Sequence, residues 1–326
     1  MWAYRLKGPC RLEMAESPSP QPEDLADGQV LLRLIAGGLC GSDLPHFRGF
    51  GAAFGREEVP YDSSPAGFPL HEVVGEVLVS RSDQLDVGAK VVGWAEGSYG
   101  LAEFVVADDN GLVPIDDSMD ATRAVMIQPL ACVIEAVNRL RHIEGRSAAV
   151  LGLGPIGVLF SHVLNSRGVG SVTGIDVLDR TDVAPFFGIH CPVQIATSRW
   201  AENFAADDRP DLVIEAIGHQ AGTFADAINA VRYQGEVYYF GIPSNDIYPL
   251  DMSKFLRKQL TLSAGATVDR RRHLLEAQAY LADNPELARR YVTDIFPVSD
   301  AQGAFERAAN PRRGQLKVTL DMLQAP

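Results

Sequence analysis

The sequence lacks long apolar runs and has few cysteines. A transmembrane helix needs about 18 consecutive apolar residues, and no run reaches that length. The amino-terminal segment Met-Trp-Ala-Tyr-Arg-Leu-Lys has no apolar centre of the kind found in signal peptides. Four scattered cysteines form no CxxC pair: Cys10, Cys40, Cys132 and Cys191. We therefore expect no disulfide framework, no membrane partner and a reducing, cytoplasmic location.

Positive charge is also scarce. The 29 lysines and arginines are outnumbered by 42 acidic residues, and the net charge is −13. This balance argues against nucleic acid as a partner and favours a small-molecule ligand. The length of 326 residues suggests two domains, and 46% hydrophobic residues are ordinary for a globular protein.

A glycine-rich stretch organises the chain. It reads Gly152-Leu153-Gly154-Pro155-Ile156-Gly157 and follows a short apolar run, Ala148 to Leu151. A helix-like segment comes next, and a second apolar run ends in Asp176. Strand, glycine turn, helix, strand and acidic residue together predict a dinucleotide-binding βαβ unit.

Each part of this unit has a physical role. Gly152 allows the tight turn, Gly154 lets the backbone approach a pyrophosphate, and Gly157 lets the helix pack closely on the sheet. The helix N-terminus offers free N–H groups to phosphates. Asp176 can accept hydrogen bonds from both ribose hydroxyls and would repel a 2′-phosphate, which favours NAD. Arg180 lies four residues further on and keeps NADP possible.

The apolar patterns predict an α/β protein with two kinds of sheet. Residues 1 to about 115 read as β-rich, with strands expected at 29–35, 73–79, 90–94 and 102–107. From about 148 to 268, strands alternate with helical segments, which predicts a doubly wound parallel sheet. Its strands are expected at 148–151, 171–175, 193–195, 212–216, 236–242 and 260–264. Helices are expected at 119–140, 269–283 and 300–309, with Pro129 marking a break or a new start.

Two segments of the β-rich region carry residues that bind metals. Cys40 lies in Gly-Leu-Cys-Gly-Ser-Asp, and His71 lies in Pro-Leu-His-Glu-Val. Taken singly, a buried cysteine and a satisfied core histidine are the simpler interpretations. Together with a dinucleotide unit downstream, they are candidate zinc ligands.

These motifs resemble the zinc-dependent medium-chain dehydrogenases/reductases of the alcohol dehydrogenase superfamily, especially the sorbitol and threonine dehydrogenase branch. The resemblance runs almost end to end. It implies a GroES-like catalytic domain (residues 1–125 and 268–326) and a Rossmann cofactor domain (residues 126–267). It also implies a homodimer or homotetramer formed by extension of the cofactor-domain sheet. The segment from Glu236 to Gly241 is the candidate neighbourhood for this contact between subunits.

The resemblance also implies roles for individual residues. Cys40 and His71 correspond to the first two zinc ligands, and Ser42 to the hydroxyl that relays the substrate proton. Asp43 corresponds to the carboxylate that orients the histidine. Glu72 corresponds to the acidic neighbour of the histidine ligand. Gly218 corresponds to a glycine at a strand end beside the nicotinamide.

The chain departs from the family at several positions. Trp94 to Gly100 bridges the gap where two-metal members insert a four-cysteine lobe, so we expect no structural zinc. Gln128 stands where the polyol branch has the third ligand, a glutamate, and an amide oxygen binds zinc poorly. Glu72 and Cys132 are possible replacements, although a core cysteine is the simpler interpretation of Cys132.

Other departures surround the expected substrate site. Leu70 stands where the family usually has glycine. Pro45 stands where it often has the histidine of the proton path, so the next residue, His46, is interpreted as a surface histidine. The long loop from Phe47 to Phe68 is expected to border the substrate mouth, with a lid role as a hypothesis.

The expected function is an NAD-dependent oxidoreductase that oxidises a secondary alcohol of a polyol, cyclitol or similar metabolite at one catalytic zinc. Two alternatives remain open. One is a zinc-free NAD(P)H reductase of activated alkenes or carbonyls on the same fold. The other is a nucleotide-binding protein without catalysis.

Overall fold

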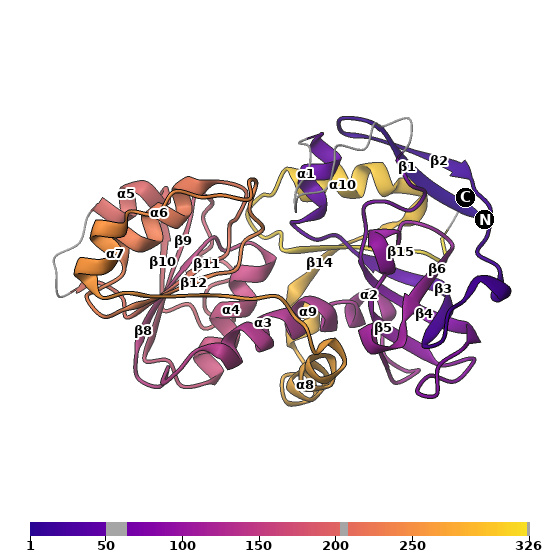
Figure 1. Cartoon of the computed structure of the whole chain (residues 1–326). Helices are drawn as coiled ribbons and strands as arrows, with labels where there is room; N and C mark the ends of the chain where they lie inside the picture. The colour runs from indigo at the N-terminus through magenta and orange to yellow at the C-terminus, as the bar shows by residue number, and fades with distance from the viewer. Residues whose placement is uncertain (50–63, 203–207, 325–326) are drawn as a thin grey trace.

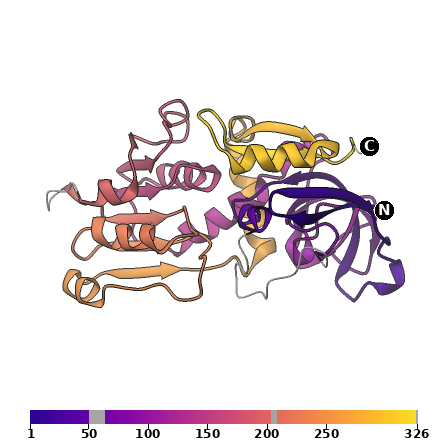
Figure 2. The same ribbon diagram turned by 90° about the horizontal axis from the view of Figure 1, so that it is seen from above.

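The computed structural model describes residues 1–49, 64–202 and 208–324, which form two lobes joined side by side (Figure 1). The amino-terminal strands and the carboxyl-terminal elements belong to the same lobe, as the view from above shows (Figure 2). The middle of the chain builds the other lobe. Most of the proposed lid, residues 50–63, lies outside the described residues. No helix in the described ranges is long and apolar enough to cross a membrane.

The first lobe is built on a seven-stranded mixed sheet in the order β14-β15-β3-β4-β5-β7, with β6 beside β3. Its long strand β3 (Gln29–Gly38) pairs with strands from both ends of the chain. The other strands are β4 (Glu72–Ser80), β5 (Lys90–Trp94), β6 (Phe104–Asp108), β7 (Leu112–Pro114), β14 (Val292–Pro297) and β15 (Lys317–Asp321). A separate hairpin is formed by β1 (Trp2–Gly8) and β2 (Arg11–Glu16).

The second lobe contains a six-stranded parallel sheet in the order β10-β9-β8-β11-β12-β13. Its strands are β8 (Ser147–Leu151), β9 (Ser171–Asp176), β10 (Cys191–Gln194), β11 (Leu212–Glu215), β12 (Glu236–Tyr239) and β13 (Thr261–Ala264). The order reverses between β8 and β11, and open α/β sheets bind their ligands beyond the carboxyl ends of strands at this point. The predicted fold class is confirmed.

Helices cover both sheets and fill the space between the lobes. The lobe with the parallel sheet carries α4 (Pro155–Ser166), α5 (Thr197–Glu202), α6 (Ala221–Ala230) and α7 (Met252–Lys258). The remaining helices are α1 (Asp43–Arg48), α2 (Ala121–Ala124), α3 (Ile127–Arg139), α8 (Arg270–Asp283), α9 (Leu287–Tyr291) and α10 (Ala301–Ala309). Helix α3 packs against α4, α8 and β5, so one buried helix contacts both lobes.

The helix predicted over residues 119–140 is divided into α2 and α3, and the new helical start expected at Pro129 is confirmed. The proline lies in the first turn of α3, where no intrahelical N–H bond is lost. In the neighbourhood expected for sheet extension between subunits, β12 is paired on both sides by β11 and β13, and β13 holds the edge position of this sheet. Sheet extension there stays a prediction.

Candidate active site

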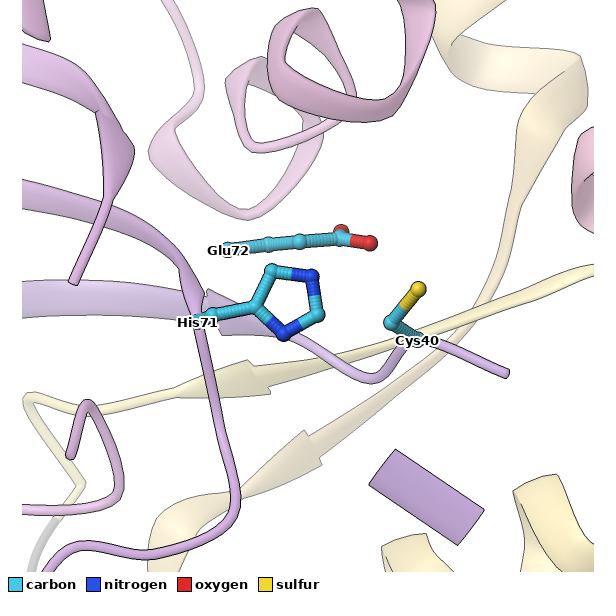
Figure 3. Close-up of side chains that lie close together, drawn as sticks. All are labelled: Cys40, His71 and Glu72. Atoms are coloured by element: carbon cyan, nitrogen blue, oxygen red, sulfur yellow. The ribbon is translucent and has the colours of Figure 1, made fainter. Parts of the chain in front are cut away.

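Three candidate metal ligands meet at the ends of two paired strands. Cys40 follows β3 and His71 precedes β4, while Glu72 begins β4 opposite Gly38. The ligand atoms of the three side chains lie within 4.8 Å of one another. Figure 3 shows one imidazole nitrogen of His71 facing the Cys40 sulfur and the Glu72 carboxylate. Antiparallel pairing thus brings together residues that are separated by about 30 positions.

A buried carboxylate fixes two of these ligands. Asp43 Oδ1 lies 3.1 Å from His71 Nδ1, and Asp43 Oδ2 accepts a hydrogen bond from the Cys40 backbone N–H at 2.8 Å. Burial opposes a charge on His71, but Asp43 and the Cys40 thiol outweigh it and raise the histidine pKa well above its usual value. Because Asp43 occupies Nδ1, Nε2 is left to bind a metal.

Glu72 has a buried cationic partner. Its Oε2 lies 2.5 Å from Lys317 Nζ, and both side chains are almost fully enclosed. Lys317 begins β15, which pairs with β3 two residues further on, so three adjacent strands build this contact. A Cβ at Gly38 would lie 2.4 Å from Glu72 Oε2 and 3.1 Å from Lys317 Cε. Glycine at position 38 therefore leaves the space in which the ion pair lies.

Helix α3 carries the two remaining candidates. The Gln128 side chain is 2% exposed, and its Nε2 donates to Cys132 Sγ at 3.5 Å. Burial raises the pKa of the Cys132 thiol to about 11, against a hydrogen bond with Thr267 that lowers it. Cys132 is only partly exposed, so its interpretation as a core cysteine stays a prediction.

The donor set fits zinc. Thiolate sulfur, imidazole nitrogen and carboxylate oxygen are its usual protein ligands, and a catalytic site keeps one position open for substrate. Both oxygens of Glu72 are buried without a hydrogen-bond donor in the described part of the chain, apart from the ion pair with Lys317. A divalent cation at the cluster would complete this electrostatic environment.

The glycine-rich turn lies at the carboxyl end of β8. A Cβ at Gly157 would lie 1.8 Å from the Gly152 carbonyl oxygen, so only glycine allows this approach. A Cβ at Gly154 would meet no atom within 4 Å and would project into open space. Pro155 and Ile156 form the first turn of α4, whose free N–H groups face the same space. The turn thus leaves room for a diphosphate at a helix N-terminus.

Asp176 and Arg180 have different environments. Asp176 ends β9, and its carboxylate accepts from the backbone N–H groups of Leu153 at 2.7 Å and Leu178 at 2.8 Å. Arg180 is 3% exposed and donates to the Gln315 carbonyl at 2.8 Å. Its guanidinium anchors the carboxyl-terminal segment of the other lobe. It therefore offers no exposed cation for a 2′-phosphate.

The end of β11 reaches the metal cluster. Glu215 accepts from the Gly218 N–H at 3.0 Å and from the Thr223 hydroxyl at 2.8 Å, which fixes the turn after the strand. The imidazole of His219 hydrogen-bonds the backbone of Gly41, which lies next to Cys40. Burial lowers the pKa of His219, and the Gly41 contact offsets this in part. The strand end near Gly218 is thereby held beside the first metal ligand.

Ser42, the expected proton relay, and His46, interpreted as a surface histidine, lie in or before α1. Ser42 precedes the helix, is partly buried, and makes no hydrogen bond that caps the helix. The ring of His46 packs edge-on against Phe68, with 4.8 Å between ring centroids. Leu70 is fully buried against Gly37, which explains how a leucine is accommodated before His71.

Three groups beside the cluster were missed by sequence reasoning: Lys317, Tyr291 and His219. Lys317 and Tyr291 are contributed by the last part of the chain, and nothing in their local patterns indicates a site. The only signal for His219 is its place directly after Gly218 at a predicted strand end.

Comparison with known proteins places this arrangement in a family. Residues 26–117 match the alcohol dehydrogenase GroES-like domain, and residues 121–322 match the glucose dehydrogenase C-terminus. Sorbitol dehydrogenase of Bacillus subtilis (strain 168) is 24% identical over 330 residues, covering 90% of each chain. D-altritol 5-dehydrogenase of Agrobacterium fabrum is 29% identical over 330 residues, covering 89% of this chain and 90% of that protein.

Solved structures agree on the fold. Alcohol dehydrogenase TADH from Thermus sp. ATN1 has a TM-score of 0.81 at 24% identity, covering 99% of this chain and 100% of that chain. Fold and site together define an oxidoreductase of the alcohol dehydrogenase type. The chain belongs to the zinc-type medium-chain alcohol dehydrogenase family, in its polyol dehydrogenase branch.

Proposed function

We propose that this protein is an NAD-dependent dehydrogenase that oxidises a secondary alcohol of a polyol, cyclitol or comparable polar metabolite at one catalytic zinc. The observation that carries the proposal is the cluster of Cys40, His71 and Glu72 beside the end of β11 in the cofactor lobe. The relatives named for sorbitol and D-altritol support the substrate class.

Each residue of the site has a separate role in the proposed reaction. A zinc ion supplies Lewis acidity that lowers the pKa of a hydroxyl group, and NAD supplies the hydride acceptor. Cys40 and His71 hold the metal, and Asp43 keeps His71 in the orientation that presents Nε2. Ser42, one residue beyond Gly41, is the proposed group that takes the proton from the substrate hydroxyl and passes it toward solvent.

Cofactor choice follows from the second strand of the parallel sheet. The Asp176 carboxylate presents negative charge at the position where the adenosine ribose lies in this fold, and it would repel a 2′-phosphate. Arg180 is buried against the Gln315 carbonyl and does not offset that repulsion. These contacts favour NAD over NADP.

The test is NADH formation on a panel of polyols by the wild-type protein, Cys40→Ser and Cys191→Ser. Loss of Lewis-acid stabilisation is worth several kcal/mol, so Cys40→Ser should lose on the order of 10²–10⁴-fold in kcat/KM. Cys191 is exposed on β10, and its replacement should leave activity unchanged.

Three outcomes would contradict the proposal. Turnover of activated alkenes with NADPH, unaffected by Cys40→Ser, would establish a zinc-free reductase, the alternative that Gln128 favours. Tight NAD binding without turnover of any alcohol would indicate a nucleotide-binding protein without catalysis. Full activity of Cys40→Ser on a polyol would remove the role of the metal.

A further inference from the structure

Cys132 lies at an opening in an otherwise enclosed helix. Between residues 127 and 137, every residue of α3 is buried except Cys132. A cysteine that filled the core would be enclosed like its neighbours. The thiol instead lies within electrostatic reach of Cys40, His71 and Glu72. These neighbours indicate that the thiol lies on the side of α3 that faces the metal cluster.

We propose that Cys132 is the third protein ligand of the metal, beside Cys40 and His71, and that Gln128 orients its sulfur. The inference rests on the proposed function, because it concerns the metal of that site. Glu72 then stays paired with Lys317 and is not needed as a ligand.

The contact between Gln128 and Cys132 gives the amide a role. These residues are one helical turn apart, and Gln128 Nε2 donates to Cys132 Sγ at 3.5 Å. An N–H donor stabilises a thiolate, whereas a carboxylate at position 128 would repel it. The amide that is a poor ligand itself is therefore a suitable neighbour for a cysteine ligand.

A second thiolate also suits the donor chemistry of the site. Two thiolates and one imidazole also form a donor set that selects zinc over magnesium or manganese, because those ions prefer oxygen ligands.

An orphaned hydroxyl independently indicates an occupant at this position. Tyr291 is fully buried, and its hydroxyl has no hydrogen-bond partner among the described residues. Burial raises its pKa, and the neighbouring Glu72, Cys40 and Cys132 raise it further. A buried donor surrounded by these groups has an acceptor available once a sulfur beside it is held as a thiolate.

The inference requires one adjustment of the cysteine side chain. The Cys132 sulfur does not belong to the set of ligand atoms within 4.8 Å of one another. A change between staggered χ1 wells moves a cysteine sulfur by about 3 Å. Metal binding supplies the free energy for such a change, since ligand deprotonation and metal binding are coupled.

The first test counts sulfur ligands in the cobalt-substituted protein. Thiolate-to-cobalt charge transfer should be about twice as intense in the wild type as in Cys132→Ser or Cys40→Ser, since each variant loses one of two thiolates. Cys191→Ser is the matched control and should retain the full intensity. Undiminished charge transfer in Cys132→Ser would overturn the inference.

A second measurement avoids substitution at the site. X-ray absorption of the zinc-loaded wild type should show two sulfur scatterers at about 2.3 Å together with nitrogen or oxygen. One sulfur scatterer in an active enzyme would overturn the role of Cys132 and leave the proposed function intact. A protein that binds neither zinc nor cobalt would overturn both.

Gln128 is a positioning residue with its own test. Gln128→Leu removes the donor but keeps a buried side chain of similar size. Zinc affinity should fall by about 10- to 100-fold, and the cobalt charge-transfer band should move to lower energy as the sulfur loses its hydrogen bond. An unchanged band with unchanged affinity would remove the role assigned to Gln128.

Discussion

The cofactor turn and the metal cluster are built in different ways. The turn is local: Gly152, Gly154 and Gly157 lie within six residues, and a Cβ at Gly157 would meet the Gly152 carbonyl oxygen while a Cβ at Gly154 would meet open space. The cluster is assembled from three distant segments, which carry Cys40, His71 with Glu72, and Lys317, and it depends on a buried ion pair between Glu72 and Lys317. A local site can be read from a short motif, whereas an assembled site depends on how strands pair.

The largest expected effect concerns the assembled site. Lys317→Met leaves the Glu72 carboxylate buried without its cation, which should cost about 3–5 kcal/mol in the free energy of unfolding. Denaturant unfolding measures this cost. The double variant Lys317→Met/Glu72→Gln should recover most of it, because no buried charge remains.

A surface pair provides the control for this prediction. Arg33 and Glu76 form an ion pair with side chains 50% and 33% exposed, and Arg33→Met should cost less than about 1 kcal/mol. An equal loss of unfolding free energy in Lys317→Met and Arg33→Met would show that burial does not increase the contribution of the Glu72–Lys317 pair to stability.

The second prediction separates two glycines of the local site. In Gly157→Ala the new Cβ would meet the Gly152 carbonyl oxygen, and overpacking of this kind costs about 1–3 kcal/mol of stability. In Gly154→Ala the Cβ meets no protein atom, so stability should be unchanged while NAD binding weakens. Thermal unfolding with and without NAD distinguishes the two. The same loss of stability in both variants would contradict the assigned roles.

The smallest expected effect is on cofactor choice. Asp176→Ala removes a charged acceptor for the ribose hydroxyls, which is worth about 1.5–3 kcal/mol, or on the order of 10- to 100-fold in NAD affinity. Discrimination against NADP should fall as well. Asp83→Ala, at an exposed position in the other lobe, is the control and should change neither affinity. Unaltered NAD binding in Asp176→Ala, measured by calorimetry, would place the ribose elsewhere.

The sequence was sufficient for the fold class and for the residues with strong local signals. The glycine motif and the acidic end of β9 follow rules of spacing within about 25 residues. Cys40 and His71 were predicted together as zinc ligands through the resemblance of their motifs to the family. The division of α2 from α3 was anticipated through Pro129, although the exact bounds were not.

The remaining features depend on long-range packing. Lys317 reads as the polar first residue of a strand, and only the pairing of β15 with β3 brings it to Glu72. From the sequence alone, Arg180 was a candidate to bind a 2′-phosphate. Its hydrogen bond to the Gln315 carbonyl instead places it in the contact between the lobes. Strand order cannot be read from apolar runs alone, so the edge position of β13 beside β12 was not predicted.

Metal stoichiometry tests the central claim most directly. Protein purified without chelator should contain about one zinc per chain, because the described residues bring together one set of zinc-type ligands. Cys40→Ser should lose that zinc, and Cys191→Ser should keep it. A wild-type protein without zinc, or a Cys40→Ser variant that keeps its full complement, would contradict the account.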